Sequence, residues 1–403
     1  MTELHLLIDA VQRNCYIADA RHAREMSLCT YLLEMREFYR WEQGIPLGET
    51  MARGDVGAWL SEREALWETL AEDNYDPLPV AGEKFDPFAS AAINQRLAPH
   101  GLVYGAGIGR FGKPHFFLGQ LAYREETDGL TVLVCEREYA RDLTAIPAAL
   151  QNGVVIVRRE ALRQWLWEKA EGWSMKKTPG TLARALAAHG YADDPRLALE
   201  RMTDAETASV ILHERGEHAA GGLLGPDWEK MLAGFKKRRP EILARAVRDN
   251  LADCLVTLPA LIERAAWPQL HFWFTNFDGM RKEMFPLLAA FDTAKVGAGP
   301  SQADAPPVGG SKPGLRAGGA IKVGAGPSQA DAPPVGGSKP GLRAGGAIKV
   351  GAGGTAELQE IVRRGAEHWH AVASNMLDRY RTDAVGAEDA LESLSHDLTT
   401  IKL

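Results

Sequence analysis

Five side chains in the C-terminal half of the sequence are of the types that bind divalent metal ions. His213 and Glu217 stand four residues apart, and so do Asp249 and Asp253, so in a helix each pair would share one face. Imidazole and carboxylate groups are the usual ligands of catalytic zinc and related ions. Together with His271, the two pairs would form a metal site if their helices faced each other. This arrangement predicts, as one functional hypothesis, a metal-dependent enzyme that uses a divalent cation.

Both pairs also have a structural interpretation. A helix that begins near residue 204, after a capping box of Thr203 and Glu206, would turn His213 and Glu217 towards solvent, opposite its apolar side. The two aspartates lie on an apolar stripe and therefore need a compensating charge. Arg245 could supply that charge as a salt bridge, because it stands four residues before the first aspartate.

A glycine-rich segment near residue 107 is a second candidate site. Gly107, Gly109 and Gly112 satisfy the GxGxxG spacing, which binds pyrophosphate when it lies between a strand and a helix. Here Pro114 and a β-rich run follow, and the chain contains neither the HRD nor the DFG sequence of a protein kinase. We therefore expect 105–113 to join two antiparallel strands and to bind no dinucleotide. Three nearby basic side chains could help the turn to hold an anion: Arg110, Lys113 and His115.

A third candidate lies near the N-terminus, where Cys15, Asp19 and His22 fall near one stripe of an expected helix. A thiolate with its base, or a metal site, would use these residue types. In the simpler interpretation Cys15 is a small buried hydrophobic residue, and His22 pairs or caps at the helix end.

Helices are expected to position most of these residues. Apolar spacings of three and four predict two N-terminal helices, with stripes over 4–18 and 28–39, that pair as a hairpin with Ser27 as an N-cap. The same spacing predicts further helices at 54–72, 88–98, 159–172, 181–189, 204–219, 228–235 and 240–263. The exception is 101–158, where β-rich runs separated by turn residues predict a small antiparallel sheet.

A 27-residue repeat interrupts the chain near residue 300. The unit occupies 295–321 and recurs letter for letter at 322–348. Each unit has seven Gly, four Pro and no aromatic residue, so it cannot bury enough surface to offset its chain entropy. We expect 294–354 to be a disordered insertion. An apolar stripe from Leu358 to Tyr380 then predicts a helix that returns and docks on the C-terminal half.

Composition and charge narrow the class of protein. The four cysteines form no CxxC pair, the first residues lack a signal-peptide pattern, and the longest apolar run spans only 255–262, against the roughly 20 residues that cross a bilayer. Of the net charge of −7, the repeat carries +5, from seven Lys or Arg and two Asp, which leaves −12 elsewhere. An acidic body repels phosphate backbones. We therefore expect a cytoplasmic protein that binds neither membranes nor nucleic acid.

Several longer runs resemble a family of proteobacterial conserved hypothetical proteins: LCTYLLEMREFYRWE, GKPHFFLGQL, VILHERGE, RAVRDNLADCLVTLPALIER and LHFWFTNFDGMR. The resemblance covers most of 1–292 and implies a cytoplasmic bacterial protein. It brings no known activity, cofactor or catalytic residue with it.

These patterns predict an α+β fold that is predominantly helical, with a small antiparallel β-sheet and a disordered repeat insertion near residue 300. The expected regions are an N-terminal helical region (1–100), a small β subdomain (101–158), a C-terminal helical region (159–293), the repeat (294–354) and a returning amphipathic helix with a tail (355–403). The leading functional hypothesis is a non-catalytic interaction or regulatory protein with a protein partner. The alternative is the metal-dependent enzyme.

Overall fold

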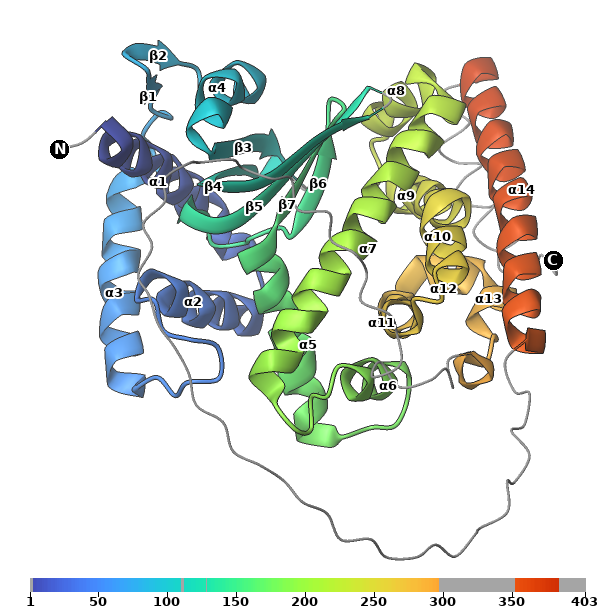
Figure 1. Ribbon diagram of the computed structural model, residues 1–403. Helices are drawn as coiled ribbons and strands as arrows, with labels where there is room; N and C mark the ends of the chain where they lie inside the picture. The colour runs from blue at the N-terminus through green and yellow to red at the C-terminus, as the bar shows by residue number, and fades with distance from the viewer. Residues whose placement is uncertain (1–2, 110–111, 128, 297–351, 384–403) are drawn as a thin grey trace, which may run out of the picture.

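The computed structural model describes residues 3–109, 112–127, 129–296 and 352–383, and within these ranges the chain is an α+β protein that is mostly helical (Figure 1). This confirms the fold class that the sequence predicts. The N-terminal elements are α1 (Glu3–His22), α2 (Leu28–Glu42), α3 (Arg53–Leu70), β1 (Leu78–Val80), β2 (Glu83–Phe85), α4 (Ser90–Leu97), β3 (Leu102–Ile108), β4 (Pro114–Thr127), β5 (Leu130–Arg141), β6 (Ala148–Gln151) and β7 (Val154–Arg158). The C-terminal elements are α5 (Arg159–Lys176), α6 (Thr181–Ala188), α7 (Pro195–Leu224), α8 (Pro226–Gly234), α9 (Arg238–Ala252), a π-helical turn (Asp253–Thr257), α10 (Leu258–Glu263), α11 (Trp267–Asn276), α12 (Gly279–Met284), α13 (Pro286–Ala289) and α14 (Ala352–Thr382). The insertion that we expect to be disordered lies outside the described residues except for 294–296 and 352–354.

The first two helices do not pair as the hairpin that the sequence predicts. Ser27 does cap α2, because its side chain accepts a hydrogen bond from the Thr30 amide at 3.2 Å. However, α1 packs mainly against α3, β4 and β5, and α2 against α3; the two helices meet through side chains, since Tyr16 of α1 shares a cluster with Met35 and Phe38 of α2. The apolar stripe of α2 is only partly buried, and Leu28 is 71% exposed. The stripes therefore predicted the two helices correctly but not their packing partners.

The strands of 102–158 form one five-stranded sheet in the order β3-β4-β5-β7-β6. Neighbouring strands are antiparallel except for β5 and β7, which are parallel. Asn152 and Gly153 join β6 to β7 with φ values of 51° and 74°, the positive angles that a two-residue hairpin turn requires. The small antiparallel sheet predicted for this region is thus confirmed, with one parallel pair as a difference in detail.

A bulged stretch of β4 bends this sheet. The register between β4 and β5 shifts near Gly119 and Leu121, where extra residues increase the local twist. A Cβ atom on Gly119 would lie 2.3 Å from Cys135 Sγ and 2.4 Å from the Arg137 carbonyl oxygen, so only glycine fits there. The resulting curl gives the sheet one convex and one concave face (Figure 1).

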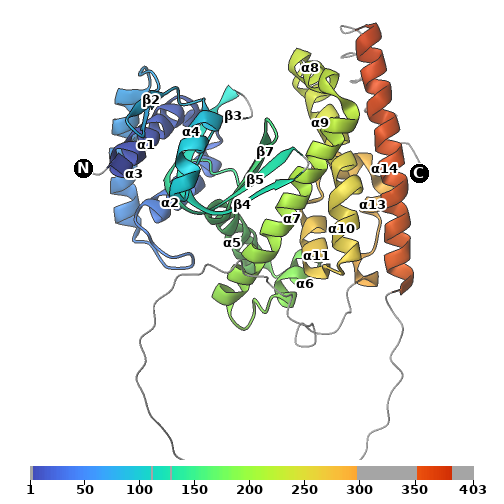
Figure 2. The same ribbon diagram turned by 45° about the horizontal axis from the view of Figure 1, so that its top comes forward.

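Helix α1 buries the convex face of the sheet. Val11 and Cys15 of α1 share a hydrophobic cluster with Tyr104, Phe116 and Leu118 of β3 and β4. Helix α4 covers the β3 edge, as Figure 2 shows. The side chain of Asn94 in α4 donates to the Tyr104 carbonyl at 2.7 Å and accepts from the Tyr104 amide at 2.8 Å, which satisfies backbone groups that an open edge would expose.

The long helix α7 lies between the sheet and the C-terminal helices (Figure 1). Asp194 caps it by accepting from the amides of residues 196 and 197, and Pro195 occupies its first turn. The start that we expected near residue 204 is therefore wrong. Thr203 does not cap the helix, because its hydroxyl group donates to the Leu199 carbonyl within it and its side chain is fully buried.

The C-terminal helices and α14 share one hydrophobic core. Phe285 and Trp369 lie edge to face with ring centroids 5.6 Å apart, and Leu358 and Met376 of α14 are buried in the same cluster. The apolar stripe of 358–380 thus docks on the C-terminal half in the way that it predicts. No helix within the described ranges is long and apolar enough to cross a membrane.

The two described ends that flank the insertion lie side by side. A Cβ atom on Gly354 would lie 2.6 Å from the Lys295 carbonyl oxygen, and Lys295 Nζ lies 2.9 Å from Glu357 Oε2. Val296 is also buried. A short linker could therefore replace the residues between 297 and 351 without moving either end.

We expect deletion of 298–350 to leave the melting temperature nearly unchanged or slightly higher. A closed loop of about 60 residues costs roughly 2 to 3 kcal/mol more than a loop of a few residues, because closure entropy grows logarithmically with length. Differential scanning calorimetry of the full and the deleted chain measures the change. A deletion variant that also removes Lys295 and Val296 is the control, and it should melt lower. A loss of several degrees in the first variant would show that the insertion stabilises the fold.

Candidate functional site

Four of the five candidate metal-binding residues come together where α7 meets α9 and the π-helical turn. His213 Nδ1 lies 2.8 Å from Asp253 Oδ1, and His213 Nε2 lies 3.6 Å from Glu217 Oε1. The helices approach closely because residue 216 is glycine: a Cβ atom there would lie 2.5 Å from the Ala252 carbonyl oxygen. The solvated polar face that we expected for His213 and Glu217 is wrong, because α7 is covered on both sides and Asp253 is 1% exposed.

Arginine side chains occupy the positions between these carboxylates. Arg281 of α12 pairs with Asp253, and Arg248 of α9 pairs with Glu217 at 3.0 Å. Arg248 also lies 3.5 Å from Asp249, so Asp249 does not pair with Arg245 as we expected. Arg245 pairs instead with Glu241, at 2.8 Å.

The electrostatics fit an ion-pair network. Burial alone would raise the pKa of Asp253, but the charges of Arg281 and His213 lower it below its usual range. Burial would likewise lower the pKa of His213, but Asp253 raises it well above its usual value. Among the described residues, no group of three His, Cys, Asp or Glu side chains has a geometry that could hold a metal ion. The metal site at His213, Glu217, Asp249 and Asp253 remains a prediction, and it would require both arginines to move.

His271 lies apart from this network. It belongs to α11, which packs against α6 and α10, and it is 4% exposed. Burial and the charge of Arg184 lower the pKa of His271 to about 4. We therefore correct its assignment to the metal site.

The Cys15, Asp19 and His22 triad of α1 is also divided by the structure. Cys15 Sγ donates to the Phe116 carbonyl at 3.2 Å, and burial raises the pKa of its thiol well above the usual value. His22 lies at the end of α1 and pairs with Glu25 at 3.2 Å. Cys15 is thus a buried hydrophobic residue rather than a thiolate. Asp19 faces the sheet and takes part in a different cluster, described below.

The glycine-rich segment builds a pocket instead of a phosphate loop. As the sequence predicts, 105–113 connects two antiparallel strands, β3 and β4. Gly105 and Gly107 alternate along β3, Gly109 directly follows it, and all three face the concave side of the sheet. Cβ atoms at these positions would lie 2.1 Å from the Phe117 ring, 2.7 Å from Gln151 Oε1 and 2.5 Å from the His115 ring, respectively. The three glycines therefore leave the space that the neighbouring side chains and the pocket occupy.

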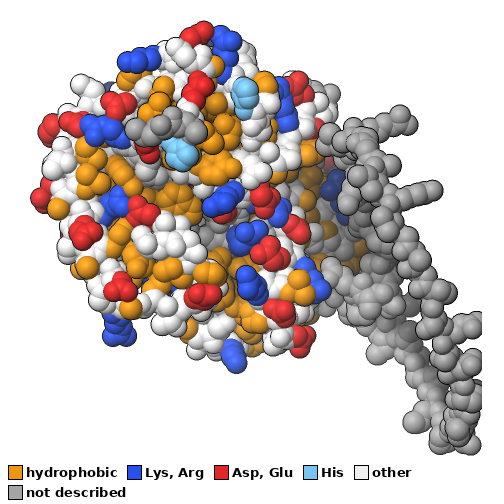
Figure 3. Space-filling model, turned by 60° about the vertical axis from the view of Figure 1, so that its left-hand side comes forward, with side chains coloured by type: hydrophobic (Ala, Val, Ile, Leu, Met, Phe, Trp, Pro, Cys, Tyr) orange, Lys and Arg blue, Asp and Glu red, His pale blue; other side chains and the backbone are white. Residues whose placement is uncertain are grey.

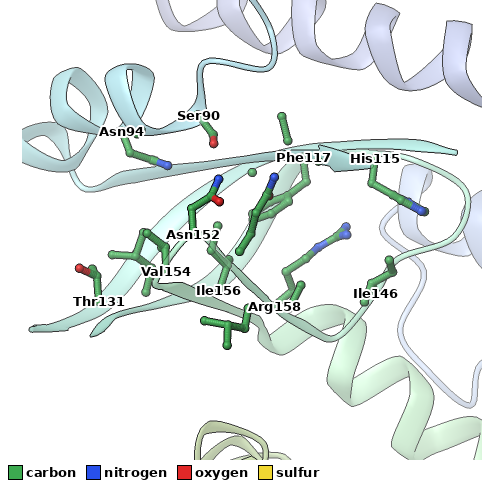
Figure 4. A pocket seen from close by; sticks show the side chains of 18 of the residues that line it. Ser90, Asn94, His115, Phe117, Thr131, Ile146, Asn152, Val154, Ile156 and Arg158 are labelled. Carbon is green, nitrogen blue, oxygen red and sulfur yellow. The ribbon is translucent and has the colours of Figure 1, made fainter. Parts of the chain in front are cut away.

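This pocket has a volume of about 450 Å³ and lies between the concave face, α4 and the β6–β7 hairpin. Its floor is apolar, from Phe117, Leu133 and Ile156. Figure 4 shows the ring of His115 and the guanidinium group of Arg158 at one end of the pocket, and Asn94 and Thr131 towards the other. A mostly apolar cavity with a few convergent polar groups is typical of small-molecule sites.

A buried charged cluster stands behind the polar end of the pocket. His115 Nδ1 lies 2.5 Å from Asp142 Oδ2, and Lys113 Nζ lies 2.9 Å from Asp19 Oδ1 and 3.9 Å from Asp142 Oδ2. Arg158 forms a two-pronged ion pair with Glu138, at 2.7 and 3.0 Å. Asp19 and Asp142 are fully buried.

The pKa values of the two buried aspartates shift in opposite directions, since burial raises the pKa of Asp19 although the charge of Lys113 opposes the shift. Burial alone would raise the pKa of Asp142, but the hydrogen bond with His115 and the charge of Lys113 lower it below its usual value. Burial would lower the pKa of Lys113, yet Asp19 and Asp142 raise it. An ionised carboxylate can only accept hydrogen bonds, so His115 Nδ1 carries the proton and donates to Asp142. Nε2 is then the ring nitrogen available to a ligand.

Sequence reasoning named His115 and Lys113 near the glycine turn but missed Asp142 and Arg158. Nothing local in the sequence links them, because they lie on the loop after β5 and at the end of β7. One signal was present: glycines at 105, 107 and 109 recur with a period of two, which is the period of one strand face rather than of a phosphate loop.

Comparison with protein families gives two adjacent matches. Residues 6–158 match the N-terminal domain, and residues 163–301 the C-terminal domain, of a family of unknown function, DUF6866. The boundary falls where β7 ends at Arg158 and α5 begins. No curated protein and no solved structure matches the chain. Because the two matches follow in order and together span more than two thirds of the sequence, the chain belongs to the DUF6866 family.

Proposed function

We propose that the chain is a ligand-responsive regulatory protein whose N-terminal domain binds a small, largely apolar molecule in the pocket of the five-stranded sheet. The observation that carries this proposal is the pocket itself. Its volume of about 450 Å³ falls in the range of roughly 300–1,000 Å³ that small-molecule sites occupy. Three alternating glycines keep it open, and a buried charged cluster holds its polar end.

The position of the pocket supports a regulatory role. Leu150 of β6 lines the pocket and belongs to the same hydrophobic cluster as Val210 and Ile211 of α7, a helix that packs against β6. A ligand on the concave face would therefore press on a wall that the central helix of the C-terminal domain supports. Occupancy could thus change the packing of α7, which lies against β5, β6 and β7 of the N-terminal domain.

Two further proposals concern the cellular location of the protein and its binding of nucleic acid. We infer a cytoplasmic bacterial protein that does not bind nucleic acid. On the face that Figure 3 shows, basic and acidic side chains are interspersed with hydrophobic ones, so this face offers no continuous basic surface for a phosphate backbone. The −12 charge outside the repeat supports the same inference.

Filling the pocket with a side chain tests the proposal. In Gly107→Val, the new Cβ atom would meet only the mobile end of Gln151, so the fold should tolerate a residue that occupies pocket volume. With decanol as an apolar probe, we expect saturable binding of one equivalent by the full chain and at least about tenfold weaker binding by the variant. Isothermal calorimetry measures both. The expected effect is large because the loss of several buried CH₂ contacts, each about 0.8 kcal/mol, exceeds the 1.4 kcal/mol that corresponds to a tenfold change in affinity.

Gln120→Val is the matched control, because Gln120 is an exposed residue of the same sheet outside the pocket. This variant should bind decanol as the unchanged chain does. Equal binding by all three proteins would show that decanol binds outside the pocket, and the proposal would then be wrong. Absence of saturable binding to the unchanged chain would also contradict it.

A further inference from the structure

Two nitrogen atoms without hydrogen-bond partners stand at the polar end of the pocket. Within the described part of the chain, His115 bonds only through Nδ1, which leaves Nε2 free. Arg158 bonds through Nε and Nη2, while its Nη1 lies 3.8 Å from Asp142 Oδ1, which is too long for a hydrogen bond. Both residues line the pocket, and both flank the same carboxylate, Asp142. A ligand group at this end could therefore contact the two nitrogens at once.

The acids and cations behind these atoms already pair with one another. Three acids, Asp19, Glu138 and Asp142, face three cations, Lys113, Arg141 and Arg158. Protonation of His115 adds one positive charge to a buried cluster, which a negative charge on the ligand would offset. Asp142 stabilises that imidazolium from the Nδ1 side.

We propose that the ligand of this pocket is an amphiphilic carboxylic acid, whose apolar body lies on the floor of Phe117, Leu133 and Ile156 and whose carboxyl group binds between His115 Nε2 and Arg158 Nη1. This inference rests on the proposed function, since it names the ligand class of the same site. The acid is ionised in water before it binds, so it enters as the carboxylate, and Nε2 takes up one proton from the solvent. The carboxylate then accepts one hydrogen bond from the imidazolium and one from the guanidinium group, and no other bond changes.

Other head groups fit this end less well. A cationic head group would face the imidazole and the guanidinium group without an accessible carboxylate, because Asp142 Oδ2 bonds to His115 and Oδ1, which has no hydrogen-bond partner, is fully buried. An alcohol could bond Nε2, but it would lack the charge-assisted bonds, which are about twice as strong as neutral ones. A phosphate dianion would need a further free cation, whereas Lys113 is bound to Asp19.

Three probes with the same ten-carbon chain test the inference on the full chain: decanoate, decanol and decyltrimethylammonium. We expect decanoate to bind at least about tenfold more tightly than decanol, and the cation to bind most weakly. His115→Gln keeps a donor for Asp142 but cannot accept a proton at the position of Nε2. This variant should lose the preference for decanoate over decanol, about 10- to 100-fold, and saturable binding of decanol, even if weakened, shows that it is folded.

Arg124→Gln is the control for unspecific attraction of anions, because Arg124 lies nine residues along β4 from His115, at the rim of the same pocket. It should keep the preference for decanoate. Equal or tighter binding of decanol to the unchanged chain would overturn the carboxylic acid and leave the apolar pocket intact. A preference that survives in His115→Gln, or that disappears in Arg124→Gln, would overturn the assigned contacts. If none of the probes binds, the proposed function fails together with this inference.

Discussion

Replacement of Asp253 by Asn is expected to lower the free energy of unfolding by about 3–5 kcal/mol, the usual cost of removing one partner from a buried ion pair. Asp253 is 1% exposed and pairs with His213 at 2.8 Å and with Arg281. The isosteric amide keeps the shape of the side chain but leaves two cations without their counter-charge. Urea unfolding at pH 6, followed by circular dichroism, measures the loss.

The control is Glu241→Gln on α9, which breaks a partly exposed pair with Arg245. Pairs of this kind contribute less than about 1 kcal/mol. If Asp253→Asn cost no more than the control, the buried network would not stabilise the junction of α7 and α9. The acidic and histidine side chains at that junction would then point to a bound metal ion or another ligand.

The contribution of this network to stability depends on pH, because the pKa values of two of its groups are shifted. The pKa of Glu217 is lowered to about 2, because the hydrogen bond from His213 and the charge of Arg248 outweigh the effect of burial. A lowered carboxylate pKa contributes stability above the unfolded value of about 4.3, and this contribution is lost as the pH falls towards 2. The raised pKa of His213 contributes stability that is complete below about 6.5 and is lost as the pH rises through the folded value. The network as a whole is therefore strongest between about pH 4.5 and 6.5.

Helical spacing predicted which acidic and histidine side chains share a face, but not what faces them. His213 and Glu217, and likewise Asp249 and Asp253, do meet across two helices. The sequence could not show that Arg281 reaches them from α12, because that contact joins residues 28 positions apart, with α10 and α11 between them. The helical wheel failed for α7 for a related reason: the exposed stripe of this helix follows Leu197, Arg201, Asp204 and Ala208, whereas His213 and Glu217 lie against α9 and the π-helical turn.

The pocket was the part of the molecule least accessible to sequence reasoning. Local patterns predicted its strands and the hairpin between β3 and β4, since alternation and turn residues are properties of neighbouring positions. Its polar end depends instead on Asp19 from α1, His115 from β4, and Asp142 and Arg158 from beyond β5. The register shifts near Gly119 and Leu121 contribute to the curl of the sheet, and a bulge leaves no reliable mark in one sequence.

Replacement of Glu206 by Gln is expected to stabilise the protein at alkaline pH and to leave it unchanged near pH 4.5. Glu206 lies on α7 with 4% of its surface exposed, and burial raises its pKa to about 8, although a hydrogen bond from Ser209 opposes the shift. In the unfolded chain the same carboxyl group ionises near pH 4.3. Between these values the folded protein holds a proton that the unfolded chain releases, so stability falls by about 1.4 kcal/mol per pH unit.

Glutamine resembles the neutral acid in shape and has no proton to lose, so the variant escapes this decline. The expected gain over the unchanged chain grows from about zero at pH 4.5 to about 4 kcal/mol at pH 8. Urea unfolding at several pH values measures the difference. Glu263→Gln, at an exposed position of α10, is the control and should show no such slope. A gain that is the same at both pH values, or a loss at pH 8, would mean that Glu206 is ionised in the folded protein. Its carboxylate would then need a cation in the core between α7 and its neighbours.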